Sequence, residues 1–167
     1  MSTGIVIREA VAGDAAGIDA LLRAAFGGPA EADLVAALRT EGDKVLELVA
    51  EADGEPAGGI FFSRLLVGDD PAAFPAVALA PLAVTPGRQR AGIGSLLMER
   101  AHAILHERGE RLSVVLGDAA YYERFGYRHA RAAGFDSAYQ CEHLQALAWG
   151  EAPTTGRLHY ARAFAGL

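Results

Sequence analysis

The sequence predicts one α/β domain that spans residues 1–167. Segments with a helical spacing of apolar residues alternate with short apolar segments that are typical of strands. Residues 74–84 are almost continuously apolar, and a glycine-rich loop joins them to a long amphipathic segment that starts at Ile93. Because no linker, repeat or low-complexity stretch interrupts this order, we expect a single domain.

The first half of the chain predicts a strand, two helices and a hairpin, at residues 5–8, 14–25, 30–40, 44–52 and 56–67. The first helix places Ile18 and Leu21 on one face, and Gly27-Gly28-Pro29 breaks it. Gly42 lies just beyond the end of the second helix, as a residue that stops a helix often does. Asp53-Gly54 is a strong signal for a hairpin turn between the two strands.

The apolar segment at residues 74–84 is typical of a strand buried on both faces. Pro75 and Pro81 lack the amide hydrogen that a paired strand donates. We therefore expect either a bulge at Pro81 or a neighbouring strand that diverges there. Either arrangement would leave backbone groups free beside the glycine-rich loop, where a ligand could pair with them.

The second half predicts a helix from Ile93 to about Gly109, a strand at 112–116, a short helix from Gly117 through Phe125, a strand from Tyr127 onward and a last strand at 144–149. The spacing of apolar residues predicts that the long helix buries Leu96, Leu97, Ala101, Ile104 and Leu105. Gly126 is suited to end the short helix, and Asp118 to cap its start. Residues 156–164 show no clear pattern.

Composition favours a globular protein, since 51% of the 167 residues are hydrophobic and 22% are charged. No apolar run reaches the length that spans a membrane, and residues 1–4 lack the character of a signal peptide. The chain has one cysteine, Cys141, which excludes an internal disulfide framework and fits a reducing compartment. We therefore expect a cytoplasmic protein with no membrane partner.

The formal net charge of −6, from 21 acidic and 15 basic side chains, argues against a nucleic-acid partner and favours cationic substrates. An anionic ligand could still bind where charge is locally positive, because screening limits the reach of distant charges to roughly 8–10 Å. Arg88 and Arg90 flank the glycine-rich loop and are candidates for such contacts; solvated loop residues are the alternative.

The loop itself reads Gln89-Arg90-Ala91-Gly92-Ile93-Gly94. Glycines at a junction between strand and helix let backbone amides approach an anion, and the helix N-terminus adds partial positive charge. The third glycine of a dinucleotide-binding loop is replaced here by Leu97, and the only lysine of the chain, Lys44, is too distant for a Walker loop. A phosphate-binding loop is the leading interpretation; a glycine-rich helix start without a ligand is the alternative.

The Gln-x-x-Gly-x-Gly pattern, preceded by Leu82-Ala83-Val84 and Pro86, resembles the acetyl-CoA pyrophosphate loop of GNAT N-acetyltransferases. Residues 116–127, Leu-Gly-Asp-Ala-Ala-Tyr-Tyr-Glu-Arg-Phe-Gly-Tyr, are similar to the YhbS-type branch of that family, and residues 158–164 resemble its C-terminal segment. The resemblance implies the GNAT acyl-CoA N-acyltransferase fold, an α/β fold with a mixed central sheet flanked by helices on both faces.

The same resemblance implies that acetyl-CoA is the co-substrate and that its acetyl group passes to a primary amine by direct attack on the thioester. The pantetheine arm would lie along Leu82, Ala83 and Val84. The residues expected at the pyrophosphate are Gln89, Arg90, Ala91, Gly92, Ile93, Gly94 and Ser95.

Two side chains are candidates for catalysis. The resemblance places a tyrosine four residues before the Gly-aromatic pair, which is Tyr122 here, and a phenol protonated at pH 7 can donate to a departing thiolate. The alternative is that Tyr121 and Tyr122 only pack the short helix against the sheet. Glu31 opens the second helix, which borders the acceptor cleft in the family; a solvated carboxylate at a helix start is the alternative.

No metal site is expected, because His102 and His106, four residues apart on the polar face of the long helix, have no further ligand beside them. The acceptor would be a small molecule or an exposed amine, and apolar C-terminal strands could support a homodimer. Two other functions stay open: a CoA-binding regulatory module without turnover, and an acyltransferase for a longer acyl chain held near Phe61 or Phe62.

Overall fold

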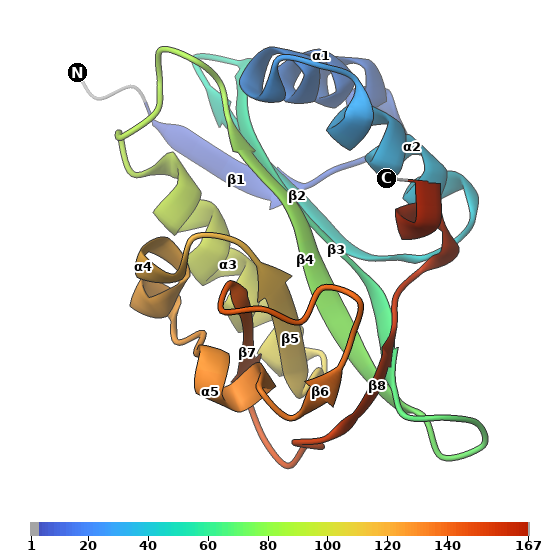
Figure 1. The fold of residues 1–167 in the computed structure, drawn as a ribbon. Helices are drawn as coiled ribbons and strands as arrows, with labels where there is room; N and C mark the ends of the chain where they lie inside the picture. The colour runs from blue at the N-terminus through green and yellow to red at the C-terminus, as the bar shows by residue number, and fades with distance from the viewer. Residues whose placement is uncertain (1–3, 167) are drawn as a thin grey trace.

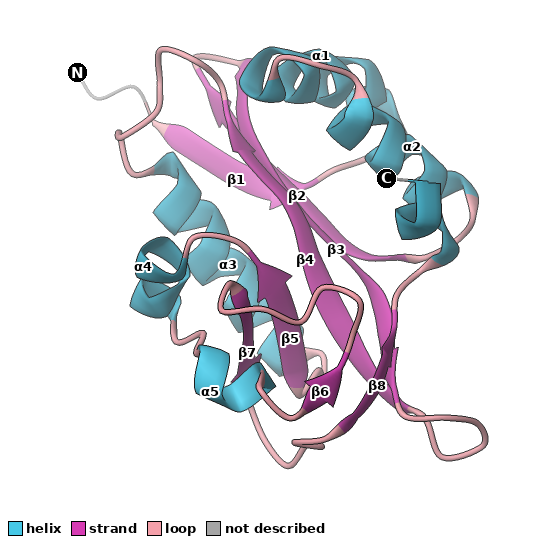
Figure 2. Cartoon of the chain, viewed as in Figure 1, coloured by secondary structure: helices cyan, strands magenta, loops and turns pink. Residues whose placement is uncertain are grey.

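The computed structural model describes residues 4–166. Residues 1–3 and 167 lie outside the described part of the chain. The expectation that residues 1–4 are not a signal peptide therefore falls mostly on residues that the structure does not describe. Helices α1 and α2 cover one face of a twisted sheet, and α3 covers the other (Figure 1). Figure 2 shows the same layers by type of secondary structure, with loops gathered at the two ends of the strands.

The strands are β1 (Ile5–Glu9), β2 (Lys44–Ala52), β3 (Glu55–Val67), β4 (Phe74–Val84), β5 (Leu112–Leu116), β6 (Phe135–Asp136), β7 (Leu144–Ala148) and β8 (Gly156–His159). The α-helices are α1 (Ala15–Phe26), α2 (Ala30–Thr40), α3 (Ile93–Glu107), α4 (Ala119–Tyr122) and α5 (His129–Ala132). Short 3-10 helices are η1 (Ala12–Asp14), η2 (Glu123–Phe125) and η3 (Arg162–Gly166).

Across residues 4–166 the strands form an eight-stranded sheet in the order β1-β2-β3-β4-β5-β7, with β8 beside β3 and β6. Strands β1 to β4 pair antiparallel, β4 and β5 pair parallel, and β5 and β7 pair antiparallel, so the predicted mixed sheet is confirmed. The predicted hairpin between β2 and β3 is also confirmed. Asp53 and Gly54 have φ angles of 55° and 79°, both positive as a tight hairpin turn requires.

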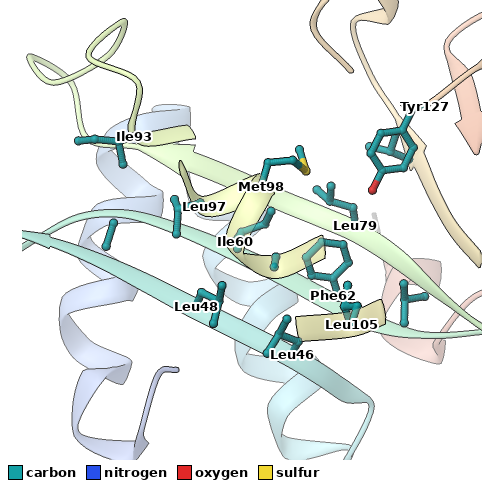
Figure 3. Packing of buried hydrophobic residues seen from close by; sticks show 14 of the residues in the cluster. Leu46, Leu48, Ile60, Phe62, Leu79, Ile93, Leu97, Met98, Leu105 and Tyr127 are labelled. Atoms are coloured by element: carbon teal, nitrogen blue, oxygen red, sulfur yellow. The ribbon is translucent and has the colours of Figure 1, made fainter. Parts of the chain in front are cut away.

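The buried face of α3 consists of Ile93, Leu97, Met98, Ala101 and Leu105. These side chains pack over β2, β3 and β4, as Figure 3 shows. Gly58 permits the close approach, because a Cβ atom there would lie 2.9 Å from Ile93 Cγ2. The prediction for Leu96 is wrong: it is 44% exposed, because the stripe that repeats every four residues turns Met98 inward in its place.

The bulge expected at Pro81 is confirmed. Ile60 lies opposite Leu82 and Phe62 opposite Leu79, so that Phe61 alone faces two residues of β4, one of which is Pro81. The neighbouring strand diverges as well, because β5 pairs with β4 only at residues 77–79. Beyond this point β4 and β5 splay apart (Figure 1).

The C-terminal third departs from the prediction in two places. The residues after Tyr127 do not form a strand: Arg128 makes one isolated bridge to Ala146, and α5 begins at the next residue. The strand at residues 144–148 is not the last, since β8 follows it and pairs with the end of β3 at Leu66 and Val67. Four-residue strands of mixed polarity such as β8 lack the alternation that reveals a strand in sequence.

Candidate active site

The glycine-rich loop carries the chain from β4 into the N-terminus of α3. Gly92 stands before the first helical residue with φ of 85°, and a Cβ atom there would meet open space. The first amides of a helix have no partner inside the helix, and in the described chain no side chain caps those of α3. The 15 residues of α3 add their dipole to these amides, so the loop suits a phosphate group.

A groove of about 640 Å³ opens beside this loop; we call it the α3 groove. It is lined by Leu82, Val84, Gln89, Arg90, Gly92, Gly94, Ser95, Tyr121, Tyr122 and Arg124. Seven of the ten residues predicted at a cofactor therefore lie together. Ala83 and Ile93 are buried in the core on opposite sides of the sheet, and Ala91 is exposed outside the groove, so these three could contribute only backbone atoms.

The backbone of β4 faces the groove beyond its last pair with β5. The Thr85 amide donates to the Ala57 carbonyl over 2.9 Å, and backbone groups alternate in direction along a strand. Ala83 therefore faces β3, while the polar groups of Leu82 and Val84 face the opposite edge. Gln89 Nε2 donates to the Val84 carbonyl over 3.2 Å on that side. No strand within residues 4–166 pairs with this part of the edge, so an extended ligand could.

The two predicted arginines behave differently. Arg88 lies 3.2 Å from Asp53 in an exposed ion pair and does not line the groove, whereas Arg90 does. A third arginine was missed by the sequence analysis. Arg124 donates to Ser95 Oγ over 3.1 Å, and its guanidinium lies 5.2 Å from the ring centre of Tyr121. Arg124 lies inside the motif at residues 116–127, and this position is the feature of the sequence that could have identified it.

Tyr121 and Tyr122 turn in different directions from α4, with their rings edge to face and their centroids 5.1 Å apart. A Cβ atom on Gly94 would lie 2.7 Å from Tyr121 Oη, which places that hydroxyl beside the start of α3. Burial, aided by Tyr121 and Asp118, raises the pKa of Tyr122 to about 12. The phenol therefore keeps its proton at pH 7. As predicted, Asp118 caps the helix, accepting from the Ala120 amide over 3.1 Å.

A second cavity, of about 370 Å³, lies where β4 and β5 separate; we call it the splay pocket. It is lined by Phe26, Glu31, Leu34, Ala78, Leu79, Ala80, Pro81, Leu82, Val114, Val115, Leu116, Tyr122, Tyr139, Tyr160 and Phe164. Leu82 and Tyr122 line both this pocket and the α3 groove, so the two cavities meet at these residues. Half-buried Glu31, in the first turn of α2, also lines the pocket.

In the described residues, Phe61 and Phe62 line neither the splay pocket nor the α3 groove, where a longer acyl chain would lie. Both side chains are buried in the core, at 2% and 0% exposure. Side chains alternate along β3, so Phe61 packs under α1 and α2 and Phe62 packs under α3. The aromatic residues that line the splay pocket include Phe26 of α1 and Tyr160 and Phe164 of the C-terminal segment.

His102 does not lie on a polar face of α3, contrary to the prediction. Its Nε2 is 3.0 Å from Tyr127 Oη, and its ring packs edge-on against Trp149 with centroids 5.3 Å apart. Burial lowers the pKa of His102 to about 4. His106, four residues later, is exposed. Within the described residues no three His, Cys, Asp or Glu side chains are grouped to share a metal ion.

The length and hydropathy of the helices show whether any of them could cross a membrane. Of the helices in the described part of the chain, none combines the length and apolar character needed to cross a bilayer.

Comparison with known sequences identifies relatives over most of the chain. A model of the acetyltransferase (GNAT) domain matches residues 44–129. The uncharacterized N-acetyltransferase YhbS of Escherichia coli (strain K12) is 40% identical over 149 residues, which cover 84% of this chain and 87% of that protein. The uncharacterized N-acetyltransferase YjhQ of the same strain is 33% identical over 139 residues, covering 81% of this chain and 77% of that protein.

Solved structures agree with these relatives. Escherichia coli YhbS in complex with CoA superposes with a TM-score of 0.90 and 32% identity, covering 99% of this chain and 94% of that one. A GNAT acetyltransferase from Brucella melitensis in complex with acetyl-CoA gives a TM-score of 0.83 and 36% identity, covering 98% and 99% of the two chains. The fold, the loop at the start of α3 and these likenesses together show that the chain belongs to the GNAT family of acetyltransferases.

Proposed function

We propose that the protein transfers an acetyl group from acetyl-CoA to the primary amine of an acceptor molecule by direct attack on the thioester. One observation carries the proposal: the α3 groove and the splay pocket meet at Leu82 and Tyr122. A thioester lying along the groove would end beside Tyr122, at the point where an acceptor in the pocket could reach it. The relatives bound to CoA and to acetyl-CoA support this choice of co-substrate.

Binding of acetyl-CoA would use backbone more than side chains. The amides of residues 89–95 would hold the pyrophosphate at the N-terminus of α3, with Arg90 and Arg124 adding positive charge at the groove. The pantetheine arm would pair with the edge of β4 at Leu82 and Val84, as a further strand would. A free amide on this edge would also polarise the thioester carbonyl, whose oxygen gains negative charge as the amine attacks.

The chemistry then needs two protons to leave the ammonium form of the acceptor and one to reach the sulfur. The amine nitrogen bonds to the carbonyl carbon, the carbon–sulfur bond breaks, and Tyr122 Oη donates its proton to the departing thiolate. Glu31 is our candidate to hold the ammonium form of the acceptor and to receive its proton, because it is the carboxylate that lines the splay pocket. Glu31 passes this first proton on to water, and the second proton, released from nitrogen as the amide forms, returns to Tyr122.

Calorimetry with CoA and an assay of thiol release from acetyl-CoA in the presence of amines test the proposal. We expect saturable binding of CoA and transfer to at least one amine. Binding without turnover of any amine would favour a CoA-binding regulatory module instead, and faster turnover of propionyl-CoA or butyryl-CoA would favour a longer acyl group. We further propose that the protein works in the cytoplasm, where the exposed thiol of Cys141 stays reduced.

A further inference from the structure

The splay pocket carries almost no charge. Among the described residues that line it, Glu31 is the only Asp, Glu, Lys, Arg or His. Three tyrosines supply the other polar side-chain atoms, and burial raises the pKa of both Tyr122 and Tyr160 to about 12, so these two are neutral at pH 7. No salt bridge found in residues 4–166 involves Glu31. The described lining of the pocket therefore offers one negative charge and no positive one.

One wall of the pocket is aromatic. The ring of Tyr139 stands edge-on to that of Tyr160, with their centroids 5.2 Å apart. The ring of Tyr160 is tilted against that of Phe164, with their centroids 5.5 Å apart. Phe26 and Leu116 also line the pocket, and their side chains are 44% and 49% exposed. Such apolar surface left open to solvent is typical of a ligand-binding site. Aromatic rings in these orientations favour another ring, which can add an edge-to-face contact.

The size of the pocket limits the acceptor. Its volume of about 370 Å³ is near the lower end of ligand pockets, which run from about 300 to 1,000 Å³. In liquid water that volume holds about a dozen molecules, so the pocket suits a ligand of roughly ten non-hydrogen atoms.

Building on the proposed function, we infer that the acceptor is a small primary amine that carries one positive charge on an apolar, aromatic body. The ammonium group would lie toward Glu31 and the ring against Tyr160 and Phe164. The ammonium group first gives a proton to Glu31. Its nitrogen then bonds to the carbonyl carbon as the carbon–sulfur bond breaks; the thiol leaves with the proton of Tyr122, and the second proton of the nitrogen restores that tyrosine. The product is a neutral amide, which loses the attraction to Glu31 and so leaves more easily.

Two other kinds of amine are disfavoured by the same lining. An α-amino acid would bring a carboxylate into a pocket with no cation to pair with it, next to the carboxylate of Glu31. A polyamine would bring a second ammonium group into an apolar region with no second carboxylate. On binding, each of these amines would bury a charged group without water or an opposite charge beside it. The free-energy cost of this burial weakens binding and raises KM.

Paired acceptors test the inference directly. We would measure thiol release and the mass of the product with tryptamine against tryptophan, with 2-phenylethylamine against phenylalanine, and with putrescine as the diamine. We expect kcat/KM for each aromatic amine to exceed that for its amino acid and for putrescine by about 10- to 100-fold, as expected for one poorly paired buried charge.

A variant at the rim provides a second readout. Phe26→Asp would place another carboxylate beside the pocket, at an exposed position where the fold tolerates it. We expect the ratio of kcat/KM for putrescine to that for tryptamine to be about 10-fold higher in Phe26→Asp than in Phe26→Asn, which removes the same ring and has nearly the same shape but adds no charge. Equal ratios in Phe26→Asp and Phe26→Asn would count against the inference.

The possible outcomes separate the inference from the proposed function. Preference for tryptophan, phenylalanine or putrescine would overturn the inference while the transferase activity stood. Saturable binding of tryptamine to the CoA-loaded protein without turnover would support the inference and contradict the proposed reaction. If the CoA-loaded protein showed no binding and no turnover of the aromatic amines, the inference would be overturned. If the protein failed to bind CoA, the proposed function itself would be overturned.

Discussion

The ring of Tyr122 stands edge-on to the ring of Tyr127, with their centroids 5.8 Å apart and their planes at 83°. Tyr127 is fully buried, and its hydroxyl lies 2.8 Å from Ser113 Oγ on β5 and 3.0 Å from His102 Nε2 on α3. The tyrosine at the meeting point of the two cavities thus rests on a ring that two elements of the core hold in place. This contact leads to the first prediction.

Tyr127→Phe should keep the packing but remove both hydrogen bonds. Ser113 Oγ is buried and would lose its partner, so the free energy of unfolding should fall by about 1–3 kcal/mol. Ser113→Ala is the matched control: it should cost less, because Tyr127 would still bond to His102. Urea unfolding of the three proteins measures the difference. Equal stability of Tyr127→Phe and the wild type would contradict the proposed role of this network.

Stability should fall in mild acid because of His102. Its pKa is about 4 in the folded protein and 6.5 when unperturbed, so between these values only the unfolded chain takes up the proton. The free energy of unfolding should therefore decrease as pH falls from about 6.5 to 4, by at most about 3 kcal/mol from this residue. Below pH 4 its contribution should change no further. In His102→Phe, which keeps an aromatic ring, unfolding curves at several pH values should show a smaller slope; an unchanged slope would assign the effect elsewhere.

Tyr122→Phe should lower kcat by about 10- to 10⁴-fold, the range expected when a positioned general acid is lost. The affinity for acetyl-CoA should barely change, because the ring still fills its place between the groove and the pocket. Steady-state kinetics with calorimetry separate the two effects. Tyr121→Phe serves as the control, and a larger loss of kcat in that variant would show that the other face of α4 carries the reaction.

Gly92→Glu should abolish binding of CoA by placing a carboxylate where the amides of α3 would meet the pyrophosphate. Because Gly92 has a φ of 85°, any side chain also strains the backbone, by roughly 1–2 kcal/mol. Gly92→Ala carries that strain without the charge and should retain measurable affinity by calorimetry. Gly94→Glu should also abolish binding, since its side chain would meet Tyr121 Oη as well. Unchanged CoA affinity in both glutamate variants would rule out this binding site.

Glu31→Gln should raise KM for a cationic amine by about 10-fold while leaving CoA affinity unchanged, because only the acceptor faces this carboxylate. If Glu31 also receives the proton, kcat should fall as well, and the acidic limb of the profile of kcat against pH should disappear. Asp33, exposed in the same first turn of α2, provides the control as Asp33→Asn. Unchanged kinetics in Glu31→Gln would place this side chain outside the reaction.

The sequence predicted most strands and helices well because local signals marked their ends. The bounds of α2, β2, β4 and β5 match the prediction, since glycines, prolines and the Asp53-Gly54 turn interrupt clear apolar patterns. Errors arose where tertiary contacts override such patterns. Leu96 belongs to the apolar stripe by spacing, yet it is 44% exposed and Met98 is buried instead, and His102 is partly buried through contacts with Trp149 and Tyr127.

The two cavities differed in how far the sequence could predict them. The α3 groove is built from one continuous loop and one motif, so most of its residues were found in advance. The splay pocket collects side chains from α1, α2, the loop after β6 and the C-terminal segment, which are far apart in the sequence. Nothing local indicates that Phe26, Tyr139 and Phe164 share a wall. Only the folded chain brings them together.

The boundaries of the two cavities along the chain have a consequence for how such proteins can diversify. Residues 44–129, which match the family model, contain every residue that lines the α3 groove. The side chains that give the splay pocket its charge and its aromatic wall, among them Glu31, Tyr160 and Phe164, come from the segments on either side. Substitutions in these flanks could change which amine the protein accepts without disturbing the groove for acetyl-CoA. A chimera with flanks from a relative should therefore inherit that relative's choice of acceptor.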